Sequence, residues 1–532
     1  MKHLIFVLLV ISAGQLLGQK QLPSEKVDVI SNFEATIKDQ NKQEVKPVLK
    51  DDNAKKPALK YEVAQRALGN ISYDAPKIRP LAMKSEKGPK AYNGFAKVGY
   101  GYPSSLFANA GYNYVGEKFK IGADIFHHDA NNSNNVPNQK FGLTTFNIGG
   151  GINTELDFAV DAALKIEDRR YNFYSVDTLP VGIDPLRQFS IGGFKAKAYN
   201  TKETSWGINY DVGFDYSNLK SNFGVKENDF DIKIALTKWF TENIPLKLVV
   251  GNDITSLTDS NKTSLNNFYF KPSLSFTGEA YNIKLGTNIT GSDGGFSVYP
   301  DLEGMVRISG NTLAMYAGWT GDVQKNTYQS IMLQNPFVVE HHSLNNSKYN
   351  KFYGGIRGKI GVVSYQGEAG FKSVKNMMLF INDSVKPYGF GLVYDDLDIF
   401  NINGTLILDV AQGLSFTGNV GYNIYTPDKQ KEAWHLPSLE ANFGAVLNAL
   451  NDKMRIKAEL YVADAGKYKV YESQKAENLN MLLDLSFEVA YRFSEKFGVF
   501  FQLNNLPNNK YQRWYNTPTY GLNVLGGLTA RF

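Results

Sequence analysis

The sequence predicts an all-β protein: a large antiparallel transmembrane β-barrel of about 22 strands (20–24), preceded by an irregular N-terminal arm. Alternation of apolar and polar side chains with a period of two recurs from about residue 92 to the end. No apolar run of 18 residues follows the first 20 residues, which excludes a helical membrane protein. The mean hydropathy of −0.30 still fits a barrel, because half of each strand faces a polar lumen.

The first 18 residues predict a secretory signal peptide that is removed near Gly18. Lys2 supplies a positive charge, residues 4–11 are almost wholly apolar, and a small residue precedes the expected cleavage site. A buried N-terminal strand is the alternative interpretation. The chain contains no cysteine, so neither disulfide bonds nor thiol chemistry is expected after export.

Residues 19–90 form the second predicted region, a periplasmic arm. They lack strand alternation, and six prolines interrupt them, each disfavouring helix at the residue before it. Residues 20–90 carry 15 Lys and Arg against 10 Asp and Glu, which accounts for the net charge of +5 of the whole chain. We expect this arm to contact a periplasmic or outer-membrane protein, or an acidic lumen wall. Nucleic acid is not expected as a partner.

Residues 91–532 form the predicted barrel. In one representative run the even positions are apolar and the odd positions polar or small: Ile208, Tyr210, Val212, Phe214 and Tyr216 against Asn209, Asp211, Gly213 and Asp215. An ionised side chain facing hydrocarbon costs roughly 2–4 kcal/mol near the bilayer midplane, so the polar positions must face water. A soluble sandwich would have to bury all these aromatic residues in its core. The pattern therefore favours a barrel in lipid.

Turn lengths refine the number of strands. Marking each alternating run gives 23, but bacterial single-chain barrels have even numbers. Short connections are expected on the periplasmic side at 411–413, 448–452 and 494–496, and long external ones at 426–437, 464–480 and 504–518. With this assignment Tyr388–Val410 must be a single strand, and the count becomes 22. Asp396 and Asp398 interrupt its apolar face, which places them above the membrane or at a bulge.

The C-terminal strand is apolar on one face and ends on an aromatic residue. The positions on that face that we expect to form a signal for the outer-membrane assembly machinery are Tyr520, Leu522, Val524, Leu528 and Phe532. The pattern places the chain in the outer membrane, in contact with its lipid.

The run Phe500–Tyr511, followed by Trp514-Tyr515, Gly521 and the terminal Phe532, resembles the last hairpin of TonB-dependent receptor barrels. The stretch Ile78–Met83 and the Tyr-Asn-Gly that starts at residue 92 resemble plug-less relatives of these receptors in Bacteroidota. Receptors of the family carry a folded plug before the barrel, and the basic, proline-interrupted arm is too short to form one. The resemblance implies a receptor-like barrel without a plug domain.

Histidines provide the only candidate metal site. His127, His128, His341 and His342 are expected in outer loops, where two His-His pairs could meet and bind a transition metal. Ordinary loop histidines are the alternative, since adjacent residues of an extended chain point in opposite directions. Neither catalytic residues nor a cofactor site is predicted, so the chain is not expected to be an enzyme.

The predicted outer loop 323–347 is unusually apolar. Its apolar residues are Met332, Leu333, Pro336, Phe337 and Val338. Such a loop forms either a constriction inside the lumen or a contact with a partner, because exposed apolar surface usually marks an interaction. Burial under neighbouring loops is the alternative.

Three functions are compatible with these features. The first is a transport or channel component gated by its arm, its loop or a partner. The second is a non-transporting structural subunit of an outer-membrane assembly or secretion complex, and the third, remote, is an outer-membrane enzyme. A barrel of about 22 strands normally holds a plugged lumen, so we expect something to close this one.

Overall fold

The structure is a computed structural model that describes residues 92–174, 179–259, 261–292, 294–339, 344–464, 466–470 and 475–532. The predicted signal peptide (1–18) and arm (19–90) lie outside the described residues, as do His341 and His342. Among the described residues, no helix has the length and apolar character needed to cross a bilayer.

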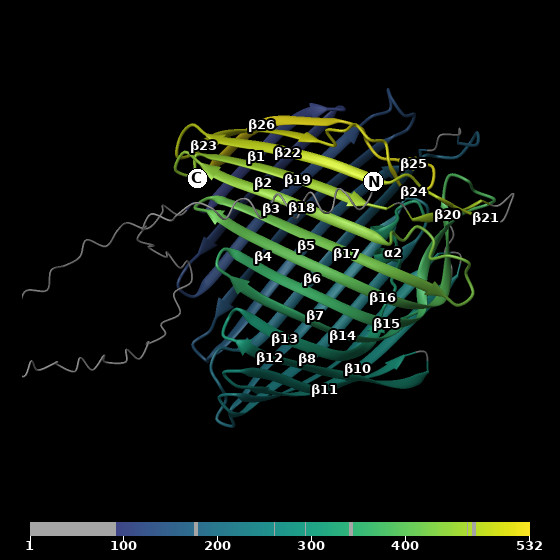
Figure 1. Ribbon diagram of the computed structural model, residues 1–532. Coiled ribbons are helices and arrows are strands. Elements are labelled where there is room, and N and C mark those ends of the chain that lie inside the picture. The colour runs from purple at the N-terminus through teal and green to yellow at the C-terminus, as the bar shows by residue number, and fades with distance from the viewer. Residues whose placement is uncertain are drawn as a thin grey trace, which may run out of the picture. The chain divides into compact units, whose positions relative to one another are not determined.

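The described residues form one antiparallel sheet of 22 strands that closes on itself (Figure 1). Each barrel strand pairs with the next barrel strand, and the last, β26, pairs with the first, β1. The predicted fold class and strand number are confirmed. The barrel strands are β1 (Gly94–Tyr102), β2 (Ser105–Val115), β3 (Phe119–Asn131), β4 (Lys140–Asn153), β5 (Phe158–Asn172), β6 (Leu186–Asn200), β7 (Ile208–Ser221), β8 (Lys226–Thr241), β9 (Ile244–Thr258), β10 (Lys262–Thr277), β11 (Tyr281–Ser292), β12 (Gly295–Ser309), β13 (Leu313–Gln324), β14 (Ser347–Ile360), β15 (Val363–Asn382), β16 (Phe390–Ala411), β17 (Leu414–Pro427), β18 (Leu439–Ala449), β19 (Met454–Ala463), β22 (Leu482–Arg492), β23 (Phe497–Asn504) and β26 (Asn523–Arg531).

The two ends of the barrel differ in the length of their connections. One end carries short turns and the C-terminus. The other carries helix α2 (Tyr328–Gln334) and two small hairpins, β20 (Lys467–Val470) with β21 (Lys475–Asn478) and β24 (Gln512–Trp514) with β25 (Thr517–Pro518) (Figure 1). The predicted division into short and long connections therefore agrees with the structure. We call the second end the long-loop end.

The region that sequence periodicity first divided into two strands is the single strand β16. Its pairing with β15 shifts register between Val374 and Met377, opposite Asp396, which is the bulge expected there. The Asp396 carboxylate accepts a hydrogen bond from the backbone N–H of Asn376 at 2.8 Å. The interruption of the apolar face is thus accommodated by an irregularity in the ladder.

The wall is apolar outside and polar inside. On β8, Phe230, Ile232 and Ile234 are each at least 40% exposed on the outer face. Asp229 and Asp231, on the other face, accept hydrogen bonds from side chains of β9 and β10. Alternation along a strand produces this separation, because successive side chains point to opposite faces of the sheet. A water-soluble protein would have to cover so continuous an apolar surface.

The first and last strands close the barrel. Gly94 and Phe532 exchange two backbone hydrogen bonds of 2.8 and 3.0 Å, and the ring of Phe532 stacks on Tyr112. Leu528 and Phe532 are both more than half exposed on the outer face, as predicted. Tyr520 precedes β26 instead of belonging to it, and its hydroxyl donates to the carbonyl of Ala130. The assembly role of this segment stays a prediction.

Replacing Gly527 by Ala should weaken the closure of the barrel. A Cβ there would lie 2.0 Å from the carbonyl oxygen of Val98 and 2.6 Å from Cα of Gly99, both on β1. Overpacking of this kind costs about 1–3 kcal/mol. The temperature at which the detergent-solubilised barrel loses its heat-modifiable migration on SDS gels should fall. Gly404→Ala is the control, because its Cβ would meet no atom within 4 Å; equal transitions in the two variants would contradict the prediction.

Candidate functional site

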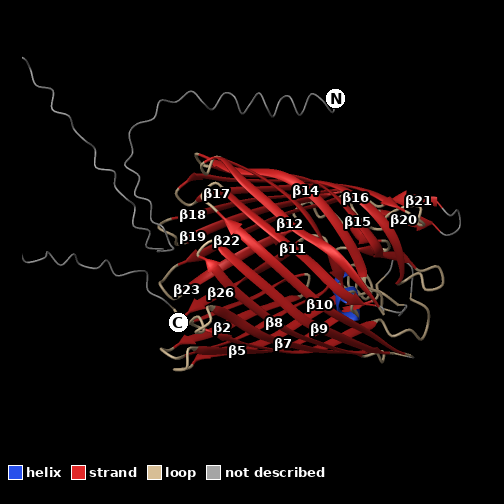
Figure 2. Ribbon diagram, turned by 90° about the horizontal axis from the view of Figure 1, so that it is seen from below, coloured by secondary structure: helices blue, strands red, loops and turns tan. Residues whose placement is uncertain are grey.

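The connection between β13 and β14 folds inward at the long-loop end. Figure 2 shows its helix α2 inside the ring of strands. Thr327 caps the helix by accepting a hydrogen bond from the N–H of Ser330, and Pro336 follows soon after the helix ends at Gln334. Because residues 325–339 contact strands far from β13 and β14, as described below, we call them the partition.

The apolar side chains of the partition are mostly buried. Met332, Phe337 and Val338, all predicted for this loop, belong to one cluster with aromatic residues of the outer connections and strands. Leu333, in contrast, is 47% exposed and lines the lumen, and Pro336 is partly buried. The structure thus brings the predicted loop residues together inside the barrel. Their role as a constriction stays a proposal.

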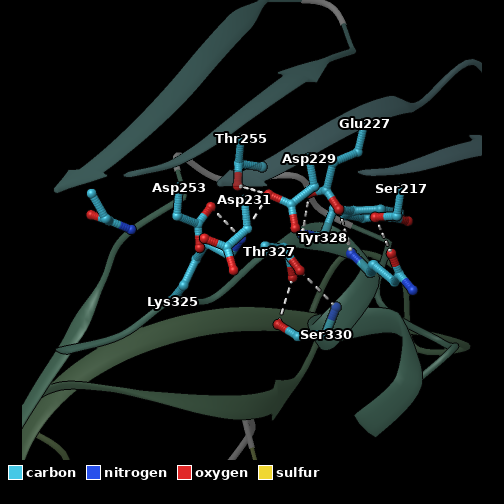
Figure 3. Close-up of polar contacts among 12 residues, drawn as sticks. Ser217, Glu227, Asp229, Asp231, Asp253, Thr255, Lys325, Thr327, Tyr328 and Ser330 are labelled. Atoms are coloured by element: carbon cyan, nitrogen blue, oxygen red, sulfur yellow. Dashed lines mark hydrogen bonds and ion pairs between the residues drawn. The ribbon is translucent and has the colours of Figure 1, made fainter. Parts of the chain in front are cut away.

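Lys325 attaches the start of the partition to β8 and β9, which are not neighbours of β13 or β14 in the barrel. Its ammonium lies 2.6 Å from Asp229 on β8 and 2.5 Å from Asp253 on β9 (Figure 3). Burial acts to lower the pKa of Lys325, but hydrogen bonds to the two carboxylates outweigh it and raise that pKa. Lys325 therefore stays charged. Thr255 donates a further hydrogen bond to Asp229 at 2.7 Å and fixes its orientation.

Glu227 binds the start of helix α2. This carboxylate, 2% exposed, accepts hydrogen bonds from the backbone N–H groups of Tyr328 (2.5 Å) and Gln329 (3.0 Å). These N–H groups have no partner within the helix, so the Glu227 carboxyl oxygens satisfy them. The side chain of Gln329 also contacts the hydroxyl of Ser217 on β7 at 3.2 Å. Polar bonds from three strands thus hold this part of the partition.

The far end of the partition is attached to β6 and β16. Arg187 donates a hydrogen bond from Nη2 to the carbonyl of Val338 at 2.6 Å. Phe390 exchanges backbone hydrogen bonds with Phe337 and Val339, of 3.0 and 2.9 Å, in a short parallel bridge. The partition is therefore attached to the wall at both of its ends.

His435 supports this bridge from the 428–438 connection. It is 1% exposed, its Nδ1 lies 3.0 Å from the carbonyl oxygen of Phe380, and its ring contacts Phe390 and Trp514. Burial lowers the pKa of His435 to about 4, so the ring is neutral at pH 7. Nε2 has no hydrogen-bond partner among the described residues, so this site does not favour the protonated ring.

Partition residues line two separate spaces. Thr327, Gln329, Ser330 and Leu333 line a lumen chamber of about 1250 Å³, and Val339 lines a recess of about 520 Å³ at the long-loop end. Carboxylates and ammonium groups line the chamber in equal numbers: Asp124, Asp161, Asp215, Asp229, Asp231 and Asp253, and Lys120, Lys165, Lys195, Lys197, Lys233 and Lys325. The chamber is therefore not the acidic wall that would hold a basic arm by charge alone.

The histidines of the predicted metal site lie on β3 or outside the described residues. His127 and His128 are neighbours in that strand, not in a loop, and they face opposite sides of the sheet. Nδ1 of His127 lies 2.8 Å from the hydroxyl oxygen of Thr144, whereas His128 contacts the rings of Phe107 and Phe141. No group of three or more potential ligands occurs among the described residues. Metal capture stays a prediction.

Sequence reasoning identified the loop but missed the residues that hold it. Lys325 and Asp253 are 72 positions apart, Glu227 and Tyr328 are 101 apart, and Arg187 and Val338 are 151 apart. The only signal was that Asp229 and Asp253 occupy the lumen phase of their strands. Periodicity gives the face of a residue, not its partner across the lumen.

Comparison with known proteins identifies the fold. No family model and no curated protein sequence matches the chain. Among solved structures, the FrpB iron transporter of Neisseria meningitidis aligns with a TM-score of 0.66 at 10% identity, covering 84% of this chain and 82% of that one. FpvA of P. aeruginosa, bound to pyoverdines, aligns at 0.63 and 9%, covering 83% and 72%. The copper transporter OprC aligns at 0.64 and 12%, covering 84% and 82%.

These structural neighbours are TonB-dependent outer-membrane receptors, and the 22-stranded barrel fits theirs. At such low identity the likeness establishes the fold. It agrees with the family that the C-terminal hairpin resembles.

Replacing Glu227 by Ala should release the start of helix α2. Each of the two hydrogen bonds contributes about 1 kcal/mol, so loss of about 2 kcal/mol would raise local opening roughly 30-fold. Hydrogen–deuterium exchange of a peptide that covers residues 325–339 should become faster. Glu368→Ala is the matched control, since Glu368 pairs with Lys351 elsewhere in the wall. Unchanged exchange in Glu227→Ala would contradict this role.

Packing around His435 should weaken in acid. The folded-state pKa of about 4 lies below the ordinary value of 6.5, so the neutral ring stabilises the fold fully above pH 6.5. As the pH falls from 6.5 to 4, protonation of the opened state removes roughly 3 kcal/mol of that stabilisation. Tryptophan fluorescence should report exposure of Trp514 over this range. His435→Asn, which tolerates the φ of 58° at this position, should lack the transition; an identical transition in that variant would assign it to other groups.

Proposed function

We propose that the chain is an outer-membrane transport or channel component whose lumen is gated by the partition. The observation that supports this most directly is the attachment of residues 325–339 to β6, β8 and β9 through Lys325, Glu227 and Arg187. A segment that lies inside a wide barrel and binds strands that are not its neighbours narrows the lumen. Ion pairs and hydrogen bonds suit a segment that must open, because water can replace them at low net cost.

The continuous apolar exterior and the fold shared with outer-membrane receptors support the outer membrane, with its lipid, as the location. Export would follow cleavage near Gly18. Residues 19–90 are the second candidate for closing the lumen, or for binding a periplasmic or outer-membrane protein. The neighbours are described as an iron transporter, a copper transporter and a receptor with bound pyoverdine, which favours transport over catalysis for this chain.

Conductance in planar bilayers tests the gate. The chain has no cysteine, so Ser217→Cys with Gln329→Cys introduces two unique thiols that a short bis-methanethiosulfonate reagent can join. Replacing residues 328–338 by a Gly-Ser linker should raise conductance, whereas the cross-link should hold it at or below the wild-type level until a reductant is added. Lys195→Cys with Asp215→Cys, which joins β6 to β7 alone, is the matched control.

Deleting residues 20–90 separates the remaining possibilities. Increased conductance would assign closure to the arm. Unchanged conductance in both the deletion and the linker variant, together with loss of a co-purifying protein from the deletion variant, would reject the gate and favour the structural subunit.

A further inference from the structure

A recess of about 520 Å³ opens at the long-loop end, on the partition's Val339 side. Its walls combine polar groups with the aromatic rings of Phe173, Phe223 and Tyr388. A recess of this size is within the range of small-molecule sites, in which a few polar groups placed among apolar walls determine what binds. The charged residues that line it are Arg187, Lys386 and Asp259.

Arg187 is a buried cation without a counter-ion among the described residues. It is 6% exposed, and its guanidinium carbon lies 3.6 Å from the ring centroid of Phe223 and 5.1 Å from that of Phe173. Both hydrogen bonds of the guanidinium leave from Nη2, to the carbonyl of Val338 and, at 3.5 Å, to the hydroxyl of Tyr328. Nε has no partner. Burying a charge and an N–H in this way is costly unless something completes the site.

The rim adds a second cation. Lys386 makes no ion pair within the described part of the chain, and Asp259 is the only described carboxylate that lines the recess. Two cations therefore face one anion there. A guanidinium with a free edge binds carboxylate and phosphate oxygens in a planar, directional manner, and stacked aromatic rings hold it in place.

We propose that this recess binds an oxyanion, a carboxylate or phosphate carried on an apolar or aromatic body, with Arg187 as the recognition residue. The body of the ligand lies against Phe173, Phe223 and Tyr388, and Lys386 contributes long-range attraction. Because Arg187 also holds the Val338 carbonyl, an anion that engages the guanidinium competes with one attachment of the partition. That coupling to passage rests on the proposed function; the binding site itself does not.

Calorimetric titration of the detergent-solubilised full-length chain at low ionic strength tests the site with three probes: benzoate, its uncharged isostere benzamide, and inorganic phosphate. Benzoate or phosphate should bind at least tenfold more tightly than benzamide. Arg187→Met should weaken that binding at least tenfold, Arg187→Lys should restore part of it, and Lys386→Gln should weaken it severalfold. Arg357→Gln, whose guanidinium contacts Met305 away from the recess, should bind as the wild type does.

Heat-modifiable migration verifies that each variant is folded, and Lys386→Gln tests the site without altering an attachment of the partition. A preference for phosphate over benzoate would assign a phosphate-bearing ligand, and the reverse a carboxylate. Equal affinity for benzoate and benzamide, absence of binding by both anions, or unchanged binding in folded Arg187→Met would overturn the proposal. Anion binding by the wild type together with unchanged conductance in the Gly-Ser linker variant would retain the site and reject the gate.

Discussion

The pairing of β26 with β1 is the interaction on which the rest of the structure depends. In hydrocarbon, an open sheet edge would leave a row of backbone N–H and C=O groups without partners, so a sheet can span a bilayer only if it closes. Close approach of the two strands at Gly527 and the paired backbone groups of Gly94 and Phe532 achieve this closure. Once the sheet is closed, inside and outside are defined, and every alternating strand has a face for each.

Closure with 22 strands creates a second requirement, because so wide a lumen does not fill with the side chains of its own wall. The partition occupies part of that lumen. One side of it is buried in an aromatic cluster, as a permanent structure would be. Its other attachments are charges and hydrogen bonds from β6, β8 and β9, which are strong while water is excluded and weak once water enters. This combination suits a segment that remains folded while its contacts with the wall change.

The charged groups inside the barrel differ in whether they have a partner of opposite charge. Along the chamber most ammonium groups lie close to carboxylates, as Lys195 does to Asp215 and Lys325 to Asp229. At the recess, Arg187 has aromatic faces, a backbone carbonyl and the Tyr328 hydroxyl around it, but no carboxylate partner among the described residues. Since a paired charge is satisfied by the fold and an unpaired buried one is not, the second arrangement is the one that indicates a ligand. Residues of the partition line both the chamber and the recess.

The sequence by itself determined the class of fold, the number of strands and the face on which each strand residue lies. These follow from local rules: the period of two, the cost of charge in lipid, and the contrast between short and long turns. The turn lengths also identified β16 as one strand, and the interruption of its apolar face predicted the bulge near Asp396. It also marked Met332, Phe337 and Val338 as unusual for an outer loop. Only the tertiary structure decided that this loop turns into the lumen and that Lys325, Glu227 and Arg187 meet it there. Those contacts join residues 72 to 151 positions apart, and their distances depend on the curvature of the closed sheet, which no local pattern contains.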